Sequence, residues 1–313
     1  MTADAGLVVA VDLGGTLTKM ALVAADGSVH DEQVVPTDRT GGAEGTVDWL
    51  LSLIGGFRAE RQVQGFGVVA PGTIDAEAGV VRAAVNLGWY DLPLRDRLTA
   101  SLGLPGAVAH DVRSAGSAEW RLGAYADVGN CLFVALGTGI AGAIVTDGRL
   151  LDADGYAGEL GHVVVPAAGA IPCPCGQRGC LETVASAAGL ARTYARLVPD
   201  PPVRTAAEIA ELARAGDPDA ARSFDLVVQA LVEALVHCIS LLGPEVVILG
   251  GGLSGATDLL VPGLQRGLTD RLTFQRRPVI AAATLGSRAG LVGAGLVGWD
   301  AVVGRTVAGP ANG

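Results

Sequence analysis

The sequence predicts an α/β fold in which one domain plan occurs twice, and three observations support this prediction. An apolar run at residues 7–11 leads directly into a glycine-rich turn, and a second one at residues 131–136 leads into another. Continuous apolar runs are typical of strands buried on both faces of a sheet. Between residues 217 and 242, apolar side chains recur at three- and four-residue spacing, which indicates a helix. The wide separation of the two strand–turn–strand units indicates a duplicated domain and not a solenoid.

The first half of the chain alternates strands with helices. Residues 7–11 and 20–24 are expected to form a β-hairpin with a glycine-rich turn between them. A helix is expected at residues 46–54 and a strand at residues 65–70, which ends in the loop 71–75. This order is typical of an α/β domain.

The second half starts the same pattern again near residue 110. A short strand at residues 107–109 precedes a helix at about 112–125, and strands at 131–136 and 140–146 flank the second glycine turn. From residue 182 onward helices dominate, apart from a strand at 246–249 that runs into three glycines. An Ala/Gly/Leu-rich helix follows near the end and is expected to pack closely against the first domain.

The composition fits one large or two medium domains with a substantial core. Of the 313 residues, 50% are hydrophobic and 17% are charged, which argues against disorder. We expect a small N-terminal α/β domain of residues 1–109, completed by a C-terminal helix at about residues 290–313. A larger α/β domain is expected at residues 110–289.

Charge and hydropathy exclude several classes of protein. The 22 basic and 32 acidic residues give a net charge of −10, which argues against nucleic-acid binding. The uncharged stretch between Asp127 and Asp147 contains Asn130 and a glycine turn, so it predicts two buried strands and no membrane helix. The start of the chain lacks a basic segment before its apolar run, so no signal peptide is expected and a cytoplasmic location follows as the default.

The turn after the first strand is the first candidate site, with Asp12, Gly14, Gly15, Thr16 and Lys19. Glycines let backbone N–H groups approach a polyphosphate, a threonine hydroxyl can donate to it, and an aspartate can hold Mg²⁺ through water. Lys19 is the only lysine of the chain, which is suggestive. The Walker A order is absent, and an ordinary hairpin turn explains this motif alone equally well.

Two further glycine turns follow predicted strands. Gly137, Thr138 and Gly139 follow one of them, and Gly251 and Gly252 belong to a glycine triplet after the other. Three such turns at strand ends predict a nucleotide-binding cleft better than three unrelated tight turns do.

Asp111 is the candidate catalytic carboxylate. The pair His110-Asp111 stands where a short apolar strand gives way to a helix, so Asp111 is either a helix N-cap or a functional group. The functional interpretation is that Asp111 accepts the proton of a hydroxyl group as its oxygen attacks the γ-phosphoryl group.

One histidine and three cysteines have the composition of a zinc site. His162 follows Glu159 by three residues, and Cys173, Cys175 and Cys180 precede Glu182. Four such ligands complete a tetrahedral Zn²⁺ site and leave no open position, so the zinc would be structural. The alternative is a loop of free thiols, and a disulfide between the two nearest cysteines would be strained.

The loop at residues 86–89 places Asn86 close to Trp89. An amide beside an aromatic ring is typical of sugar sites, where the amide binds hydroxyl groups and the ring covers C–H faces. A turn with a packed tryptophan is the alternative.

Taken together, these motifs resemble the ROK family (repressors, open reading frames, kinases) of sugar kinases, within the actin/hexokinase superfamily. The resemblance extends over nearly the whole chain and is most specific at Glu159-x-Gly161-His162 and the Cys-x-Cys-Gly-x-x-Gly-Cys-x-Glu run that ends at Glu182. It implies a two-domain ribonuclease-H-like fold that binds ATP and a hexose in an interdomain cleft. It also implies a homodimer or a dimer of dimers.

The resemblance assigns roles to residues. It implies that Asp111 is the catalytic base and that His162 both ligates zinc and contacts the sugar. The other implied sugar contacts are Asn86, Glu159 and Glu182, and the other zinc ligands are Cys173, Cys175 and Cys180. The implied nucleotide-phosphate turns contain Gly14, Gly15, Thr16, Gly137, Thr138, Gly139 and Gly251, with Lys19 at a position where many members have lysine.

Two positions depart from the family pattern. His110 stands where the family usually has an asparagine whose amide contacts sugar hydroxyl groups, so His110 is a candidate sugar contact of different shape. From Gly139 onward the second phosphate turn reads Gly-Ile-Ala-Gly-Ala, whereas family members commonly have Gly-Ile-Gly-Gly-Gly. The two additional methyl groups are expected to alter the affinity for the phosphoryl donor.

The expected function is an ATP-dependent kinase for the 6-hydroxyl group of glucose or a close derivative. An amino sugar such as kanosamine, glucosamine or N-acetylmannosamine, or a cyclitol, is the alternative acceptor. Polyphosphate is a less favoured donor because the acidic chain shows no basic groove. A sugar-responsive regulator is disfavoured because the first motif begins at Asp12, which leaves no room for the DNA-binding module of family repressors. A zinc hydrolase is disfavoured by the closed ligand set.

Overall fold

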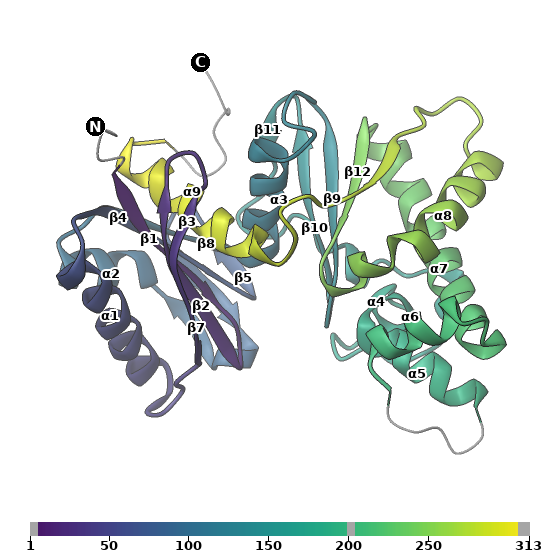
Figure 1. Cartoon of the computed structure of the whole chain (residues 1–313), viewed down its shortest axis with the longest axis horizontal. Coiled ribbons are helices and arrows are strands. Elements are labelled where there is room, and N and C mark those ends of the chain that lie inside the picture. The colour runs from purple at the N-terminus through teal and green to yellow at the C-terminus, as the bar shows by residue number, and fades with distance from the viewer. Residues whose placement is uncertain (1–5, 199–203, 306–313) are drawn as a thin grey trace. The chain divides into compact units, whose positions relative to one another are not determined.

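The computed structural model describes residues 6–198 and 204–305 (Figure 1). These residues form two compact units that the chain enters more than once. Unit 1 takes in the described parts of residues 1–126, 149–157 and 288–313. Unit 2 takes in the described parts of residues 127–148 and 158–287.

Unit 1 is built on a five-stranded mixed sheet with the strand order β3-β2-β1-β4-β8. Strand β1 pairs antiparallel with β2 and parallel with β4, while β2 pairs antiparallel with β3 and β4 pairs parallel with β8. The strands are β1 (Leu7–Leu13), β2 (Leu17–Ala24), β3 (Val29–Pro36), β4 (Val63–Ala70) and β8 (Gly106–His110).

Helices cover both faces of this sheet, because alternate strand residues point to opposite sides. Val9 and Val11 of β1 pack in one core with helix α1 (Gly42–Glu60) and helix α2 (Leu94–Leu102). Val8 and Ala10 pack in another core with helix α9 (Ala289–Val302) (Figure 1).

A small antiparallel sheet completes unit 1. It consists of β5 (Thr73–Asp75), β6 (Val80–Ala84) and β7 (Trp89–Leu92), and the 3₁₀ turn η1 (Val85–Leu87) connects the last two. Trp89 is fully buried in the core with α1 and α2.

Helix α9 lies very close to the main sheet because glycines face each other there. A Cβ atom on Gly67 of β4 would lie 1.9 Å from the carbonyl oxygen of Ala294 and 2.6 Å from the nitrogen of Gly298. Real Cβ atoms do not approach backbone atoms so closely, so only glycine fits at this position. The expected close packing of the C-terminal helix on the first domain therefore has a direct structural basis.

Unit 2 repeats the strand order at the centre of unit 1. Strand β9 (Cys131–Leu136) pairs antiparallel with β10 (Ile140–Thr146) and parallel with β12 (Val246–Gly250), which pairs parallel with β13 (Val279–Ala282). The order β10-β9-β12-β13 thus matches β2-β1-β4-β8 of unit 1. The fold is the two-domain α/β ribonuclease-H-like type that the sequence predicted. The short strand β11 (Arg149–Leu150) follows β10, where the chain returns to unit 1.

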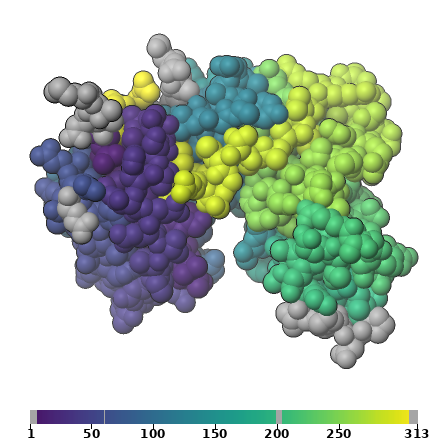
Figure 2. All heavy atoms as spheres, in the orientation of Figure 1, coloured from purple at the N-terminus to yellow at the C-terminus, as the bar shows by residue number. Residues whose placement is uncertain are grey.

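Helices make up most of the rest of unit 2, and α5 to α8 form much of its green surface in the space-filling view (Figure 2). They are α4 (Glu182–Ala185), α5 (Ala187–Leu197), α6 (Ala206–Arg214), α7 (Pro218–Leu242) and α8 (Thr257–Arg271). The short 3₁₀ segments are η2 (Leu160–His162), η3 (Pro166–Ala168) and η4 (Gly252–Ala256), while η5 (Gly286–Arg288) leads to α9.

The long helix α7 shows how local sequence sets the ends of an element. Asp217 accepts hydrogen bonds from the backbone N–H groups of Asp219 and Ala220 at the start, and Gly243 ends the helix with a positive φ of 56°. Phe224, Val227 and further apolar side chains enter the core of unit 2. By length and apolar composition α7 would also suffice to cross a membrane, a test that the core helix of a soluble protein passes as well.

The boundary between the units differs from the expected boundary between residues 109 and 110. Helix α3 (Asp111–Leu122) belongs to unit 1, and so does the returning segment 149–157. The reason is that α3 packs on α9: a Cβ atom on Gly293 would lie 2.4 Å from the carbonyl oxygen of Ser114. Arg121 also binds both carboxylate oxygens of Asp300, at 2.7 and 3.0 Å.

Candidate active site

Asp111 lies at the junction of β8 and α3, as its first helical residue. The N-cap of α3 is His110 and not Asp111, because the ring Nδ1 of His110 accepts the backbone N–H of Arg113 at 3.3 Å. The carboxylate of Asp111 therefore does not serve as the helix cap. Its Oδ1 accepts the N–H of Val112 at 2.7 Å, and its side chain remains 31% exposed. Of the two interpretations that the sequence left open, the geometry leaves the carboxylate available for chemistry.

Arg113 fixes the start of α3 from within unit 1. Its side chain is buried, and its guanidinium group donates to the carbonyl oxygens of Gly155 at 2.9 Å and Ile74 at 3.1 Å. Its Nε also lies 3.2 Å from Asp152. Arg113 could not be singled out from the sequence, because its partners lie about 40 positions away along the chain.

Asp12 lies at the end of β1, opposite Lys19 in the register of β1 and β2. Burial and the negative charge of Asp111 raise the pKa of Asp12 to about 6, while Lys19 acts in the opposite direction. A Cβ atom on Gly290 of α9 would lie 2.6 Å from Oδ2 of Asp12. The structure therefore groups the carboxylates of Asp12 and Asp111 near the start of α9.

The first glycine turn is a tight connection between β1 and β2. The N–H of Gly14 donates to the carbonyl oxygen of Leu17 at 3.1 Å, and the hydroxyl group of Thr37 donates to the carbonyl oxygen of Gly14 at 2.7 Å. Thr16 is exposed at the tip of the turn. Thr37 was not among the residues predicted from the sequence, because it reaches the turn from the far end of β3.

Asn86 lies beside this first turn within unit 1. It is exposed in η1, and a Cβ atom on Gly15 would lie 3.7 Å from its own Cβ. Arg39 donates to its carbonyl oxygen at 2.9 Å and holds the loop. Trp89 is buried and packs in the core, so the stacking role that a neighbouring aromatic ring suggested is not available to it.

The second glycine turn is braced by a carboxylate within unit 2. Oε2 of Glu182, at the start of α4, accepts the N–H of Ile140 at 2.8 Å. A Cβ atom on Gly139 would lie 2.5 Å from the same oxygen, so the glycine makes room for Glu182. Thr138 lies inside this turn, where the N–H of Gly137 donates to the carbonyl oxygen of Gly139 at 3.0 Å.

The third glycine turn follows β12 and meets the end of β9. Gly251 has a φ of 80°, and a Cβ atom there would lie 2.6 Å from the carbonyl oxygen of Leu136. Both facts require glycine at this position. Gly252, at the start of η4, has no neighbour within 4 Å of a built Cβ atom. The turns at Gly137–Gly139 and Gly251 therefore lie together at the same end of the unit 2 sheet.

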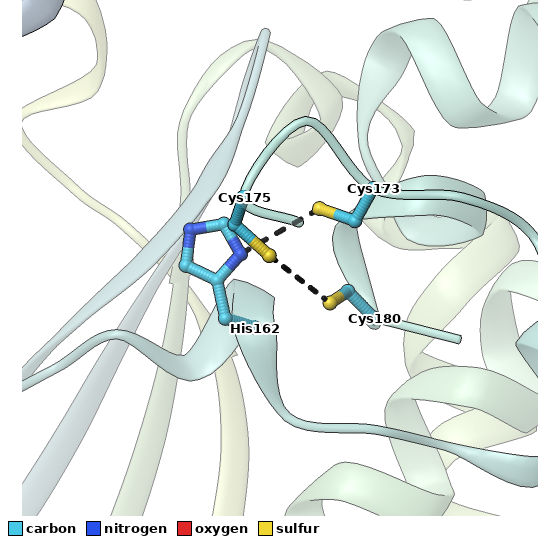
Figure 3. Close-up of side chains that lie close together, drawn as sticks. All are labelled: His162, Cys173, Cys175 and Cys180. Carbon is cyan, nitrogen blue, oxygen red and sulfur yellow. Dashed lines mark hydrogen bonds between the residues drawn. The ribbon is translucent and has the colours of Figure 1, made fainter. Parts of the chain in front are cut away.

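Four potential metal ligands converge in unit 2 (Figure 3). The ligand atoms of His162, Cys173, Cys175 and Cys180 all lie within 4.8 Å of one another. The Sγ atoms of Cys175 and Cys180 are 3.7 Å apart, and Nδ1 of His162 lies 3.8 Å from Sγ of Cys173. A tetrahedron with Zn–S bonds of 2.3 Å has an edge of about 3.8 Å, so these separations fit a zinc ion.

The cysteines are free thiols, and their protonation follows their surroundings. Burial and the neighbouring thiols raise the pKa of Cys180 to about 12, whereas hydrogen bonds, chiefly from the backbone of Gln177, lower the pKa of the exposed Cys175. Because a coordinating thiol is deprotonated by the cation, a bound metal would reverse the shift at Cys180.

The ring of His162 faces two ways. Its Nδ1 is directed at the cysteine cluster, while its Nε2 lies 3.8 Å from Oε2 of Glu159. Glu159 itself is 46% exposed. Gly158 and Gly161 pack against the backbone of β10, where Cβ atoms would lie 2.1 Å from Gly142 O and 2.3 Å from Ile140 O. These close contacts hold the Glu159–His162 segment against the strand after the second turn.

The fold and these strand-end side chains define a protein of the actin/hexokinase class. A model of the ROK family matches residues 8–298. The chain is 35% identical to a glucokinase of Halalkalibacterium halodurans, over 92% of this chain and 93% of that protein. It is 33% identical to an N-acetylmannosamine kinase of Yersinia pestis, over 90% and 98% of the two chains. The chain therefore belongs to the ROK family.

Solved structures agree with this assignment. A ROK family glucokinase from Streptomyces griseus, in complex with glucose and AMPPNP, superposes with a TM-score of 0.80 at 32% identity, covering 94% of this chain and 100% of that one. A ROK family transcriptional regulator, a homologue of the E. coli MLC protein, superposes with a TM-score of 0.86 at 26% identity. That comparison covers 97% of this chain and 80% of the regulator.

Proposed function

We propose that the protein is an ATP-dependent sugar kinase that phosphorylates the 6-hydroxyl group of glucose. The observation that carries this proposal is the state of Asp111, whose Oδ1 is held by the N–H of Val112 while the side chain stays partly exposed. A general base must be fixed in place and still open to its substrate. The similarity to glucokinases over more than nine-tenths of the chain supports glucose as the acceptor.

In the proposed reaction Asp111 accepts the proton of the sugar hydroxyl group. The hydroxyl oxygen then forms a bond to the γ-phosphorus of ATP, and the bond from that phosphorus to the β–γ bridging oxygen breaks. The bridging oxygen keeps the electron pair and leaves as part of ADP. The products are a sugar 6-phosphate and ADP, with the proton on Asp111 until solvent removes it.

The glycine turns are the proposed phosphate-binding elements. Gly14, Gly15 and Thr16 contribute from unit 1, and the turns Gly137–Gly139 and Gly251–Gly252 contribute from unit 2. Mg²⁺ would screen the charge that develops on the phosphate oxygens. Asp12 is suited to hold the cation through a bridging water molecule, because it is a partly buried carboxylate close to the negative charge of Asp111. Lys19, opposite Asp12, adds a positive charge at this end of the hairpin.

The proposed sugar contacts come from polar side chains of both units. Asn86 is an exposed amide beside the first turn, and Glu159 is an exposed carboxylate beside His162. Glu182 gives one oxygen to Ile140, which leaves Oε1 for a sugar hydroxyl group. His110 was also expected to contact the sugar.

We propose that the zinc ion is structural. Three thiolates and one imidazole complete its tetrahedral coordination and leave no position for a catalytic water. The ion would tie the segment around residues 173–180 to His162, next to Glu159 and before Glu182. It would therefore organise two of the proposed sugar contacts.

An amino sugar is the second candidate acceptor, as N-acetylmannosamine kinases are also similar over nine-tenths of the chain. A sugar-responsive regulator is the candidate from another class of protein, and it is supported by the similarity to a ROK transcriptional regulator.

We also propose, on the resemblance to family members, that the protein is cytoplasmic and forms a homodimer or a dimer of dimers. Sedimentation of the purified protein measures that state directly.

The substitution Asp111→Asn tests the proposed function. It keeps the size of the side chain and the acceptor for the N–H of Val112 but removes the base, so kcat should fall by about 10²- to 10⁴-fold. Glucose binding, measured by calorimetry, should stay within about threefold of the wild type. A variant that retains the wild-type rate of ADP release would exclude Asp111 as the base. A wild-type protein that binds glucose but releases no ADP would support the regulator instead.

A further inference from the structure

His110 engages protein atoms with both of its ring nitrogens. It is the last residue of β8 and the N-cap of α3, and its side chain is only 8% exposed. Nδ1 accepts the N–H of Arg113 at 3.3 Å, and Nε2 lies 3.4 Å from Oδ1 of Asp111. The ring therefore has no nitrogen left to form a hydrogen bond with a sugar hydroxyl group.

The helix cap selects one tautomer of the ring. A nitrogen that accepts a hydrogen bond carries no proton, so the neutral imidazole must carry its proton on Nε2. Burial lowers the pKa of His110 to about 4; Asp111 opposes this shift, and Arg113 adds to it. The other charged groups that line the small cavity beside the ring are Arg121, Asp152 and Asp300. Near neutral pH the ring is therefore an uncharged donor, and its Nε2 lies 3.4 Å from Oδ1 of Asp111.

The two oxygens of Asp111 consequently have different surroundings. Oδ1 accepts the N–H of Val112 at 2.7 Å and faces Nε2–H of His110 at 3.4 Å. That second separation is long for a hydrogen bond, as is common for catalytic contacts before substrate binds. No hydrogen bond joins Oδ2 to another residue in the described parts of the chain. Oδ2 is thus the oxygen left to accept the sugar proton.

We propose that His110 is a positioning residue of phosphoryl transfer, which holds Oδ1 of Asp111 through Nε2–H so that Oδ2 faces the sugar hydroxyl group. The imidazole does not contact the sugar. This inference rests on the proposed kinase function and replaces the expected role of His110 as a sugar contact. It also explains how a histidine is accommodated before the base, because one ring caps the helix and orients its first residue.

Two substitutions separate the cap from the positioning contact. His110→Asn places an acceptor where Nδ1 lies and keeps the cap, since asparagine is a strong N-cap residue, but it removes the donor at Nε2. His110→Gln places an amide near the position of Nε2 and loses the cap. His110→Ala removes both groups. Each purified variant is assayed for Tm, for kcat and for KM with glucose.

The inference predicts that kcat and Tm respond to different atoms. For His110→Asn we expect a Tm near the wild-type value and a kcat at least about tenfold lower, because the base is misplaced. For His110→Gln we expect a lower Tm and recovery of most of the kcat that His110→Ala loses. KM for glucose should stay within about threefold in all three variants. A kcat that only follows Tm, or a KM that rises most in His110→Gln and His110→Ala, would overturn the inference.

Nitrogen NMR of the histidine rings gives a readout that does not depend on activity. The chain has four histidines, and the His110→Asn spectrum identifies the signals of His110. We expect the Nε2–H tautomer without titration between about pH 5.5 and pH 8. An Nδ1–H tautomer, or a midpoint near 6.5, would contradict the inference. If the wild type shows this tautomer but phosphorylates no sugar, the proposed function fails and the geometry of His110 stands.

Discussion

At the residue scale, Asp12 is an acid whose charge is set by its neighbours. Its folded pKa of about 6 lies above the ordinary value of 3.8, because the ionised form is partly buried and close to Asp111. Below about pH 3 both the folded and the unfolded chain hold the proton, and the residue costs no stability. As the pH rises from about 4 through 6, the unfolded chain ionises Asp12 freely whereas the folded protein can ionise it only against this environment, so stability is lost over that window.

The substitution Asp12→Asn should remove this pH-dependent loss. Without Mg²⁺ or nucleotide, we expect the variant to gain stability over the wild type between about pH 5 and pH 8, on the order of 2 kcal/mol by denaturant unfolding. The control is the same comparison near about pH 3, where both the folded and the unfolded chain hold the proton and the gain should be small. An equal difference at both pH values would show that the ionisation of Asp12 does not limit stability.

Residue geometry also decided a question that the sequence left open. The pair His110-Asp111 at a strand–helix junction predicted that Asp111 is either an N-cap or a base, and the structure gives the cap to His110. Asp111 could be selected from its place after an apolar strand. That His110 is the cap depends on the direction of its ring, which no pattern of residue types encodes.

At the element scale, the start of α9 is shaped to receive Asp12. Gly290 leaves space for the carboxylate, and a Cβ atom at this position would lie 2.6 Å from Oδ2. For Gly290→Ala we therefore expect displacement of Asp12, a kcat lower by about tenfold or more, and weaker use of Mg-ATP. The matched control is Gly56→Ala, in the exposed part of α1, where a Cβ atom meets nothing within 4 Å. If both variants behave alike, the space at Gly290 does not matter for the site.

The segment around the four metal ligands gives a second prediction for an element. Cys180→Ser should lower the zinc content from about one ion per chain to nearly none, because a serine hydroxyl is a poor ligand in a thiolate set. We expect Tm to fall and KM for glucose to rise, as Glu159 and Glu182 flank this segment. Cys238→Ser, a cysteine of α7 outside the cluster, should keep its zinc. Plasma mass spectrometry of dialysed protein measures the metal, and an unchanged content in Cys180→Ser would refute the site.

Elements with a clear local signal were predictable, and elements fixed by tertiary contacts were not. Strand β1 and helix α7 follow from apolar runs and spacing. Strand β3 was missed because it is an edge strand with mostly exposed side chains, so its sequence carries no apolar alternation. The contacts of Thr37 and Arg113 were missed for a related reason, since each side chain meets its partners only after distant elements pack together.

At the scale of the whole molecule, the duplicated fold gives each unit its own set of candidate residues. Unit 1 holds Asp12, Asp111 and the first glycine turn, while unit 2 holds Glu159, Glu182 and the other two turns. The sequence revealed the duplication through its repeated strand–turn–strand units. It placed the boundary too early, because α3 reads as the first helix of a new domain until its packing against α9 is known.

The measurement that tests the central claim most directly is coupled ADP release by the zinc-loaded wild type with Mg-ATP. The acceptors are glucose, glucosamine, kanosamine, mannose, N-acetylmannosamine and a cyclitol, with a no-sugar control and Asp111→Asn in parallel. We predict sugar-dependent turnover that is highest with glucose and is about 10²- to 10⁴-fold lower in Asp111→Asn. A folded, zinc-loaded protein that releases no ADP above the control with any of these acceptors would contradict the kinase assignment.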